Sequence, residues 1–142
     1  MRRRNSDRMA QAESTRAIER PDGRLVLVVD DFPETIDVLA SILSRHGYYV
    51  VLAMSGADAI RIAREQQPDL IVMDFAMPRM NGLEATRILK AHESTRGIPV
   101  ILYTAHGGPE VEIEAQRAGC AAVALKPLET QRLFDLVERA LA

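Results

Sequence analysis

The segment LVLVVDD, residues 25–31, is a run of five apolar residues that ends in two aspartates. A similar run, LIVMD, ends in an aspartate at residue 74, and AAVALK ends in a lysine at residue 126. Short apolar runs rich in β-branched residues are typical of strands covered on both faces of a parallel sheet. Because ligands bind beyond the carboxyl ends of such strands, we expect Asp30, Asp31, Asp74 and Lys126 to meet at one edge.

Strand-like and helix-like segments alternate along the chain from residue 24 onward. Gly47 and Pro68 stand where two of the helices should end, and Ser55 with Asp58 three residues later has capping-box spacing. Five βα units predict an α/β fold, with a doubly wound five-stranded parallel sheet and helices on both of its faces. The expected strands are residues 25–29, 48–54, 70–74, 100–104 and 121–125. The expected helices include about 34–46, 83–92 and 129–141, and a loop of residues 77–82 leads into the second of these.

The bulk properties are those of one ordinary globular domain. The chain has 142 residues, of which 47% are hydrophobic, and a net charge of −2, which gives no reason to expect bound nucleic acid. Residues 1–23 are polar and arginine-rich and predict a flexible tail, so the domain is expected to be residues 24–142. The sequence contains one cysteine and neither a signal-peptide pattern nor a long apolar run, which predicts a cytoplasmic protein without a membrane span.

Several carboxylates at one edge of a sheet need a compensating charge. Two unit charges about 4 to 5 Å apart repel by several kcal/mol at an effective dielectric constant near 20. Mg²⁺ prefers hard oxygen ligands and usually takes one or two carboxylates, so it is the natural partner of this cluster. With a metal bound, Asp74 could attack a phosphorus atom as a nucleophile. Lys126 and the Thr104 hydroxyl could then neutralise phosphoryl oxygens, which is most of what phosphoryl transfer requires.

At the strand ends and in the loop after the third strand, the chain has Asp30-Asp31, Asp74, Met77-Pro78, Asn81-Gly82, Thr104-Ala105 and Lys126-Pro127. Through these residues, the segment 24–142 resembles the receiver domain of two-component response regulators. The resemblance implies a flavodoxin-like (βα)5 fold and a phosphoacceptor, Asp74, that takes phosphate from a histidine kinase or phosphotransfer protein with Mg²⁺ as cofactor. It also implies that Asp31 binds the metal directly, Asp30 mainly through water, and Ala76 through its backbone carbonyl. Such a protein catalyses only its own phosphorylation and dephosphorylation and switches a protein–protein interaction.

One position departs from the family pattern. The family usually has tyrosine or phenylalanine three residues before the lysine, and this chain has Val123. Tyr103 is the aromatic residue nearest to Thr104 in sequence. Because successive strand residues point to opposite faces of a sheet, we do not expect Tyr103 to replace the missing ring. Phosphorylation should survive this change, whereas the aromatic readout of the signal should not operate in its usual form.

Two other function classes fit the sequence less well. A phosphohydrolase of the haloacid-dehalogenase type needs a second acid two residues after the nucleophile, and Ala76 stands there. A flavodoxin-like cofactor binder needs a phosphate-binding loop after its first strand, where Asp30 and Asp31 would repel phosphate. Within the receiver interpretation, a single-domain regulator, monomeric or weakly dimeric, is favoured over a receiver fragment of a larger regulator or hybrid kinase. Its downstream protein target is not identified by the sequence.

Overall fold

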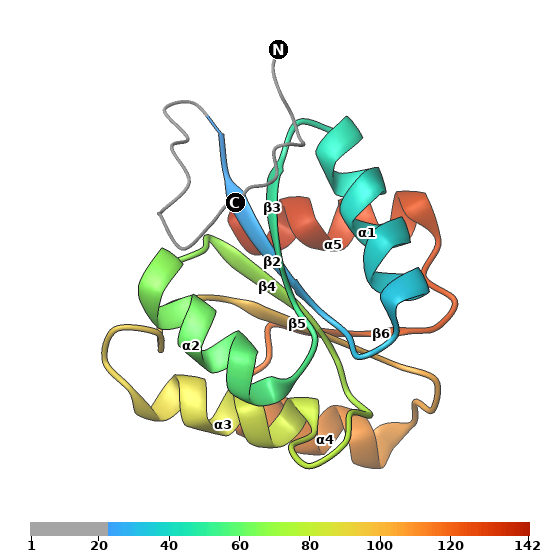
Figure 1. The fold of residues 1–142 in the computed structure, drawn as a ribbon. Coiled ribbons are helices and arrows are strands. Elements are labelled where there is room, and N and C mark those ends of the chain that lie inside the picture. Colours follow the sequence, from blue (N-terminus) through green and yellow to red (C-terminus); the bar gives the residue numbers. More distant parts are fainter. Residues whose placement is uncertain (1–22) are drawn as a thin grey trace.

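The computed structural model describes residues 23–142, in which a parallel sheet lies between two layers of helices (Figure 1). The predicted polar tail, residues 1–23, lies outside the described residues except for Gly23. The alternation of strands and helices confirms the predicted α/β fold. In chain order the elements are β2 (Leu25–Val29), α1 (Pro33–Arg45), β3 (Tyr49–Ala53), α2 (Gly56–Gln66), β4 (Leu70–Asp74), α3 (Gly82–Ala91), β5 (Val100–Thr104), α4 (Pro109–Ala118), β6 (Ala122–Leu125) and α5 (Thr130–Leu141).

The five strands lie in the order β3-β2-β4-β5-β6, and every neighbouring pair is parallel. From β2 the chain first adds β3 on one side and then returns to add β4 on the other. The sheet therefore has its topological switch point between β2 and β4, where open α/β sheets bind their ligands. Asp30 and Asp31 directly follow β2, and Asp74 ends β4, so all three acids belong to this point.

Burial follows the position of each strand in the sheet. All residues of the central strands β2, β4 and β5 are buried, whereas the edge strands β3 and β6 are partly exposed. Continuous apolar sequence is what strands covered on both faces require. This is why the three central runs could be recognised from sequence. The edge strand β6 begins one residue later than predicted, after the exposed Ala121.

Helices α1 and α5 form the layer that covers one face of the sheet, as Figure 1 shows. We call it the α1/α5 layer. Its buried contacts use large side chains from the sheet, the tyrosine of β5 among them, and from both helices. The cluster contains Val26, Val28, Leu70, Val72, Ile101, Tyr103 and Ala124 from the strands, Ile36, Leu39 and Leu43 from α1, and Leu133, Leu136 and Val137 from α5.

Helices α2, α3 and α4 cover the opposite face (Figure 1), and we call them the α2/α3/α4 layer. Alanines Ala59, Ala63 and Ala85 are fully buried where α2 and α3 pack on the sheet. Small side chains let a helix approach the sheet closely. Gly82 shows how close this approach is, because a Cβ atom on it would lie 2.4 Å from the backbone oxygen of Asp74.

Side-chain caps begin two of the helices. Ser55 begins α2 and accepts a hydrogen bond from the Asp58 N–H, but the reciprocal half of the predicted capping box is not formed. The full capping box is at α3, where Asn81 and Glu84 exchange two bonds of 2.9 Å. Sequence analysis placed Asn81 in a loop and began this helix at residue 83. The motif N-x-x-E could have shown the correct start.

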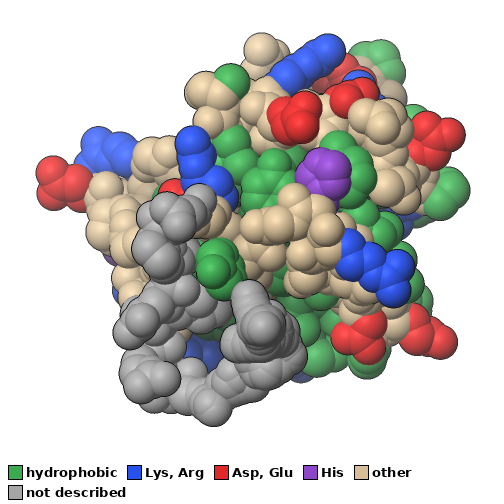
Figure 2. Space-filling view, turned by 90° about the horizontal axis from the view of Figure 1, so that it is seen from above, with side chains coloured by type: hydrophobic (Ala, Val, Ile, Leu, Met, Phe, Trp, Pro, Cys, Tyr) green, Lys and Arg blue, Asp and Glu red, His purple; other side chains and the backbone are tan. Residues whose placement is uncertain are grey.

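Figure 2 views the molecule from above, onto the end where the strands begin and thus away from the three aspartates. On this face basic and acidic side chains lie around the rim, with hydrophobic side chains between them. Within residues 23–142, the helices are all too short or too polar to cross a membrane.

Candidate functional site

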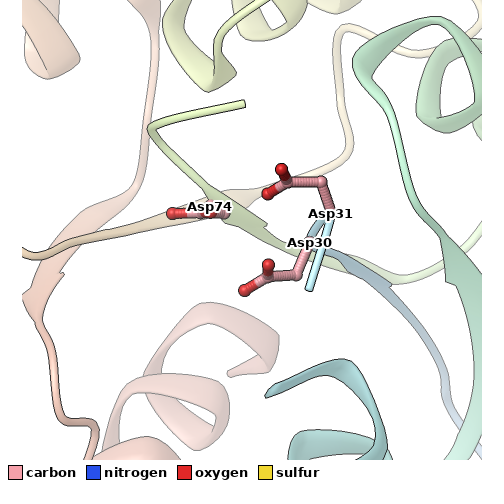
Figure 3. Close-up of side chains that lie close together, drawn as sticks. All are labelled: Asp30, Asp31 and Asp74. Carbon is pink, nitrogen blue, oxygen red and sulfur yellow. The ribbon is translucent and has the colours of Figure 1, made fainter. Parts of the chain in front are cut away.

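The predicted acidic residues do come together at the carboxyl edge of the sheet. One carboxylate oxygen from each of Asp30, Asp31 and Asp74 lies within 4.8 Å of the other two. Figure 3 shows the three side chains beyond the ends of β2 and β4, with their carboxylates pointing to the same side. Asp30 and Asp74 are buried, whereas Asp31 is half-buried and so lies nearer to solvent.

Asp30 is held by the protein at both carboxylate oxygens. Its Oδ1 accepts a hydrogen bond of 2.8 Å from the backbone N–H of Phe32. Its Oδ2 accepts a hydrogen bond of 2.6 Å from the hydroxyl of Tyr103 and lies 3.8 Å from the Nζ atom of Lys126. The residue is only 1% exposed, so these partners replace water around the carboxylate.

Asp74 is the last residue of β4, and its polar contacts with the rest of residues 23–142 are made by Oδ1. Oδ1 lies 3.0 Å from Lys126 Nζ and 3.4 Å from the backbone nitrogen of Ala76. Burial raises the pKa of Asp74, and the neighbouring Asp30 adds to the rise, whereas the bond from Lys126 lowers it. Asp74 is therefore a buried acid whose negative charge the protein compensates only in part.

Lys126 directly follows β6 and is the cation of the site. Its side chain is 30% exposed, and its Nζ atom bridges from Asp74 Oδ1 to within 3.8 Å of Asp30 Oδ2. The same Nζ lies 4.9 Å from the centre of the Tyr103 ring, in a cation–π contact. Its backbone N–H donates to the carbonyl of Thr104 at 2.9 Å, which joins the ends of β5 and β6.

Thr104 ends β5 at the same edge, but its hydroxyl is occupied locally. Oγ1 donates to the carbonyl of His106 at 3.2 Å and accepts from the His106 N–H at 3.1 Å. This local turn ties Thr104 to the loop before α4. The predicted contact of Thr104 with a phosphoryl oxygen would require the hydroxyl to leave these partners, and it stays a prediction.

Tyr103 is the residue that sequence reasoning did not place at the site. Its ring is 1% exposed within the α1/α5 layer, and its hydroxyl lies 3.2 Å from the carbonyl of Val29 as well as 2.6 Å from Asp30. Burial raises the pKa of Tyr103, and the bond to Asp30 raises it further, so the phenol stays protonated and acts as a donor. Its only sequence signal is its position next to Thr104.

Val123 and Tyr103 lie on opposite faces of the sheet, as the alternation of strand residues predicted. Val123 packs in the α2/α3/α4 layer against the cluster that contains Leu102, its partner in the β5–β6 register. Tyr103 packs in the α1/α5 layer. The tyrosine therefore does not occupy the place where the family usually has its aromatic ring.

The charges of the cluster favour a divalent cation. Among the residues that the structure describes, three carboxylates face the ammonium group of Lys126, and two of the three are almost fully buried. Burial raises the pKa of Asp74, and the nearby Asp30 raises it further, which agrees with this imbalance. Oxygen ligands from two strand ends, with one acid near solvent, fit Mg²⁺, which keeps part of its water shell.

Comparisons with known proteins agree with this geometry. The family described as response regulator receiver domain matches residues 26–138. The chain belongs to the response regulator receiver domain family. Protein PilH of Pseudomonas aeruginosa is 34% identical over 117 residues, which are 82% of this chain and 97% of that protein. The polar-differentiation response regulator DivK of Brucella ovis is 34% identical over 113 residues, which are 80% of this chain and 92% of DivK.

A solved relative connects the fold to a metal. The receiver domain of sensor histidine kinase PA1611 from Pseudomonas aeruginosa has magnesium coordinated in its active-site cleft. It shares 32% sequence identity with this chain and a TM-score of 0.77, over 84% of this chain and 98% of that one. The chain is thus a receiver domain of two-component signalling, and its acidic triad resembles the magnesium site of receivers.

Proposed function

We propose that this protein is a phosphorylation-dependent switch in which Asp74 accepts a phosphoryl group from a histidine kinase or a phosphotransfer protein. The observation that carries the proposal is the meeting of Asp30, Asp31, Asp74 and Lys126 at the switch point of the sheet. An oxygen of Asp74 would form a bond to phosphorus while the bond from phosphorus to the donor's imidazole nitrogen breaks. Lys126 already contacts the acceptor carboxylate and is positioned to neutralise the incoming charge.

Asp31 and Asp74 are the acids we assign to Mg²⁺, with the backbone carbonyl of Ala76 as a third protein ligand. Asp30 would act mainly through water, since both of its oxygens already have protein partners. When bound, the metal supplies positive charge that offsets the clustered carboxylates and the phosphoryl oxygens. The Thr104 hydroxyl would contact a phosphoryl oxygen after leaving the backbone of His106.

A hollow beside the site supports an encounter with a protein donor. It has a volume of about 510 Å³ and lies between the start of α1 and the segment that leads into α5, with Lys126 in its lining. Two exposed apolar side chains of this region, Phe32 at 64% and Val38 at 58%, are suited to a partner surface. A protein docked there would lie next to Lys126, which contacts Asp74.

The extent of the similarity to PilH and DivK supports a single-domain regulator, because it covers 97% and 92% of those proteins. We propose a cytoplasmic protein, monomeric or weakly dimeric, that exchanges phosphate with a kinase and then binds a downstream protein. Under this proposal the protein acts on no substrate other than its own phosphoryl group.

Incubation with acetyl phosphate and Mg²⁺, followed by intact-mass analysis, tests the assignment. We expect wild-type protein to gain about 80 Da, the mass of one phosphoryl group. Asp74→Ala should gain nothing, and Asp37→Ala, which alters an exposed aspartate on α1, should be labelled like wild type. Labelling of Asp74→Ala to the wild-type level would exclude Asp74 as the acceptor.

A further inference from the structure

The hydroxyl of Tyr103 connects two strands that are not neighbours. Tyr103 lies on β5 and Asp30 follows β2, with β4 between these strands in the sheet. The ring spans this distance inside the α1/α5 layer, and the hydroxyl ends 2.6 Å from Asp30 Oδ2. A buried tyrosine usually satisfies its hydroxyl with whatever acceptor is near. Here the acceptor is one of the acids of the candidate metal site.

The contrast between Asp30 and Asp31 shows what this bond does. Phe32 N–H and the Tyr103 hydroxyl fix the Asp30 carboxylate at both of its oxygens. Among residues 23–142, Asp31 has no such donor, and it is half-buried. Asp31 is therefore free to turn toward a cation, whereas Asp30 is locked in one orientation beside it.

The same tyrosine also contacts the cation of the site. Lys126 Nζ lies 4.9 Å from the ring centre and 3.0 Å from Asp74 Oδ1. Hydroxyl and ring thus serve different groups: the hydroxyl holds Asp30, and the ring face supports Lys126 beside Asp74. Substitutions can remove these two contacts separately.

We propose that Tyr103 is a positioning residue of the magnesium site, which holds Asp30 in an outer-sphere orientation through its hydroxyl and supports Lys126 through its ring. The inference rests on the proposed function, because it assumes that the acidic cluster binds Mg²⁺. Partners that orient metal-site carboxylates without touching the metal contribute strongly to affinity. Tyr103 would fill this role from the strand that also carries Thr104, on the sheet face opposite Val123.

Calorimetric titration of the unphosphorylated protein with MgCl₂ separates the two contacts. Tyr103→Phe keeps the ring and should weaken Mg²⁺ binding about tenfold, the lower end of the loss expected for an outer-shell partner. Tyr48→Phe is the matched control, since it removes the hydroxyl of a half-buried tyrosine that has no contact with the acids, and it should bind like wild type. The hydroxyl contact is thus measured by Mg²⁺ affinity.

Tyr103→Leu removes the ring as well. Its phosphorylation should stay roughly two- to tenfold slow even at saturating Mg²⁺, the range that loss of a cation–π contact can produce. In an Asp30→Ala background, Tyr103→Phe should cause no further loss of Mg²⁺ affinity, because the hydroxyl acts through Asp30. A further loss in that background, or wild-type Mg²⁺ affinity in Tyr103→Phe alone, would overturn the inference. Failure of the wild-type protein to bind Mg²⁺ would instead overturn the proposed function.

Discussion

The two helical layers cover the same sheet by different means. In the α1/α5 layer, large side chains such as Tyr103, Leu43 and Leu133 are fully buried, and neither helix has a side-chain cap. In the α2/α3/α4 layer, α2 and α3 pack through alanines and begin at side-chain caps. Large side chains thus carry the helix contacts of the first layer. The second layer also buries large side chains such as Leu89, and adds close approach through alanines and side-chain caps.

The site draws on both layers. Asp74 is set by the close approach of α3, where Gly82 touches its backbone, and its partners Lys126 and Asp30 are set by Tyr103 from the other layer. A substitution in either layer should therefore alter the positions of the same carboxylates, through α3 in one layer and through Tyr103 in the other. Substitutions in each layer test this difference.

The largest effect should come from the buried face of α5. Leu133 is fully buried in the α1/α5 layer, and Leu133→Ala should lower the free energy of unfolding by about 2–5 kcal/mol, as loss of a core leucine does. Val38→Ala, at a 58% exposed position of α1, should change it by less than about 1 kcal/mol. Urea unfolding followed by circular dichroism measures both values. Equal losses would contradict the claim that burial stabilises this layer.

A glycine in the other layer should give the next largest effect. A Cβ atom at Gly82 would lie 2.4 Å from the Asp74 oxygen and 2.7 Å from Leu102 Cδ1, so Gly82→Ala should cost about 1–3 kcal/mol by overpacking. It should also slow labelling by acetyl phosphate, because the strand that carries Asp74 must shift. Gly97→Ala is the control, since nothing lies within 4 Å of its added methyl group, and it should leave stability and labelling almost unchanged.

The fold could be predicted from sequence because its signals are local. Five apolar runs and the breaks at Gly47 and Pro68 indicated the number and order of elements, and helix ends differed from expectation by at most one residue. The capping box at Asn81 was missed because Asn81-Gly82 was interpreted as part of a loop. At Ser55, only the serine half of the predicted box forms, and Asp58 instead lies 3.4 Å from Arg61.

The site could be predicted only where strand ends carry it. Asp30, Asp31, Asp74 and Lys126 meet because parallel strands end at one edge, which follows from sequence order alone. The bond from Tyr103 to Asp30 joins residues 73 positions apart and depends on which face of β5 the ring occupies and on how far it extends. No local pattern contains that information. The turn of Thr104 toward His106 depends in the same way on the conformation of the following loop.

Helix caps should give a smaller effect of opposite sign in the two layers. Asn81→Ala removes the bond to the Glu84 N–H and should cost about 1 kcal/mol. At α1, Phe32 occupies the cap position without a side-chain bond, so Phe32→Ser should gain about 0.5–1 kcal/mol. Thermal unfolding of both variants measures the difference. A loss in Phe32→Ser would mean that its exposed ring contributes more than the missing cap.

The smallest effect on stability should come from the charge of Asp74, the carboxylate whose surroundings both layers shape. Folding raises the pKa of Asp74 above its ordinary value of 3.8. Between these two pKa values the folded state binds more protons than the unfolded state. Stability is therefore lost as pH rises through this window. With a chelator present, Asp74→Asn should melt slightly above wild type at pH 7. It removes a buried charge and its repulsion from Asp30, and this gain is partly offset by loss of the ion pair with Lys126.

This advantage of Asp74→Asn should vanish as the pH falls below 3.8, where the acid is neutral in both states. Addition of Mg²⁺ should reverse the order at pH 7, because only the wild-type protein keeps the full ligand set and a bound ion stabilises the folded state. Melting curves with EDTA and with MgCl₂ measure both changes. If the variant melts below wild type in EDTA at pH 7, the bond from Lys126 stabilises the Asp74 carboxylate more than burial and Asp30 destabilise it. Lys126, supported by Tyr103 of the α1/α5 layer, would then already compensate the charge of Asp74.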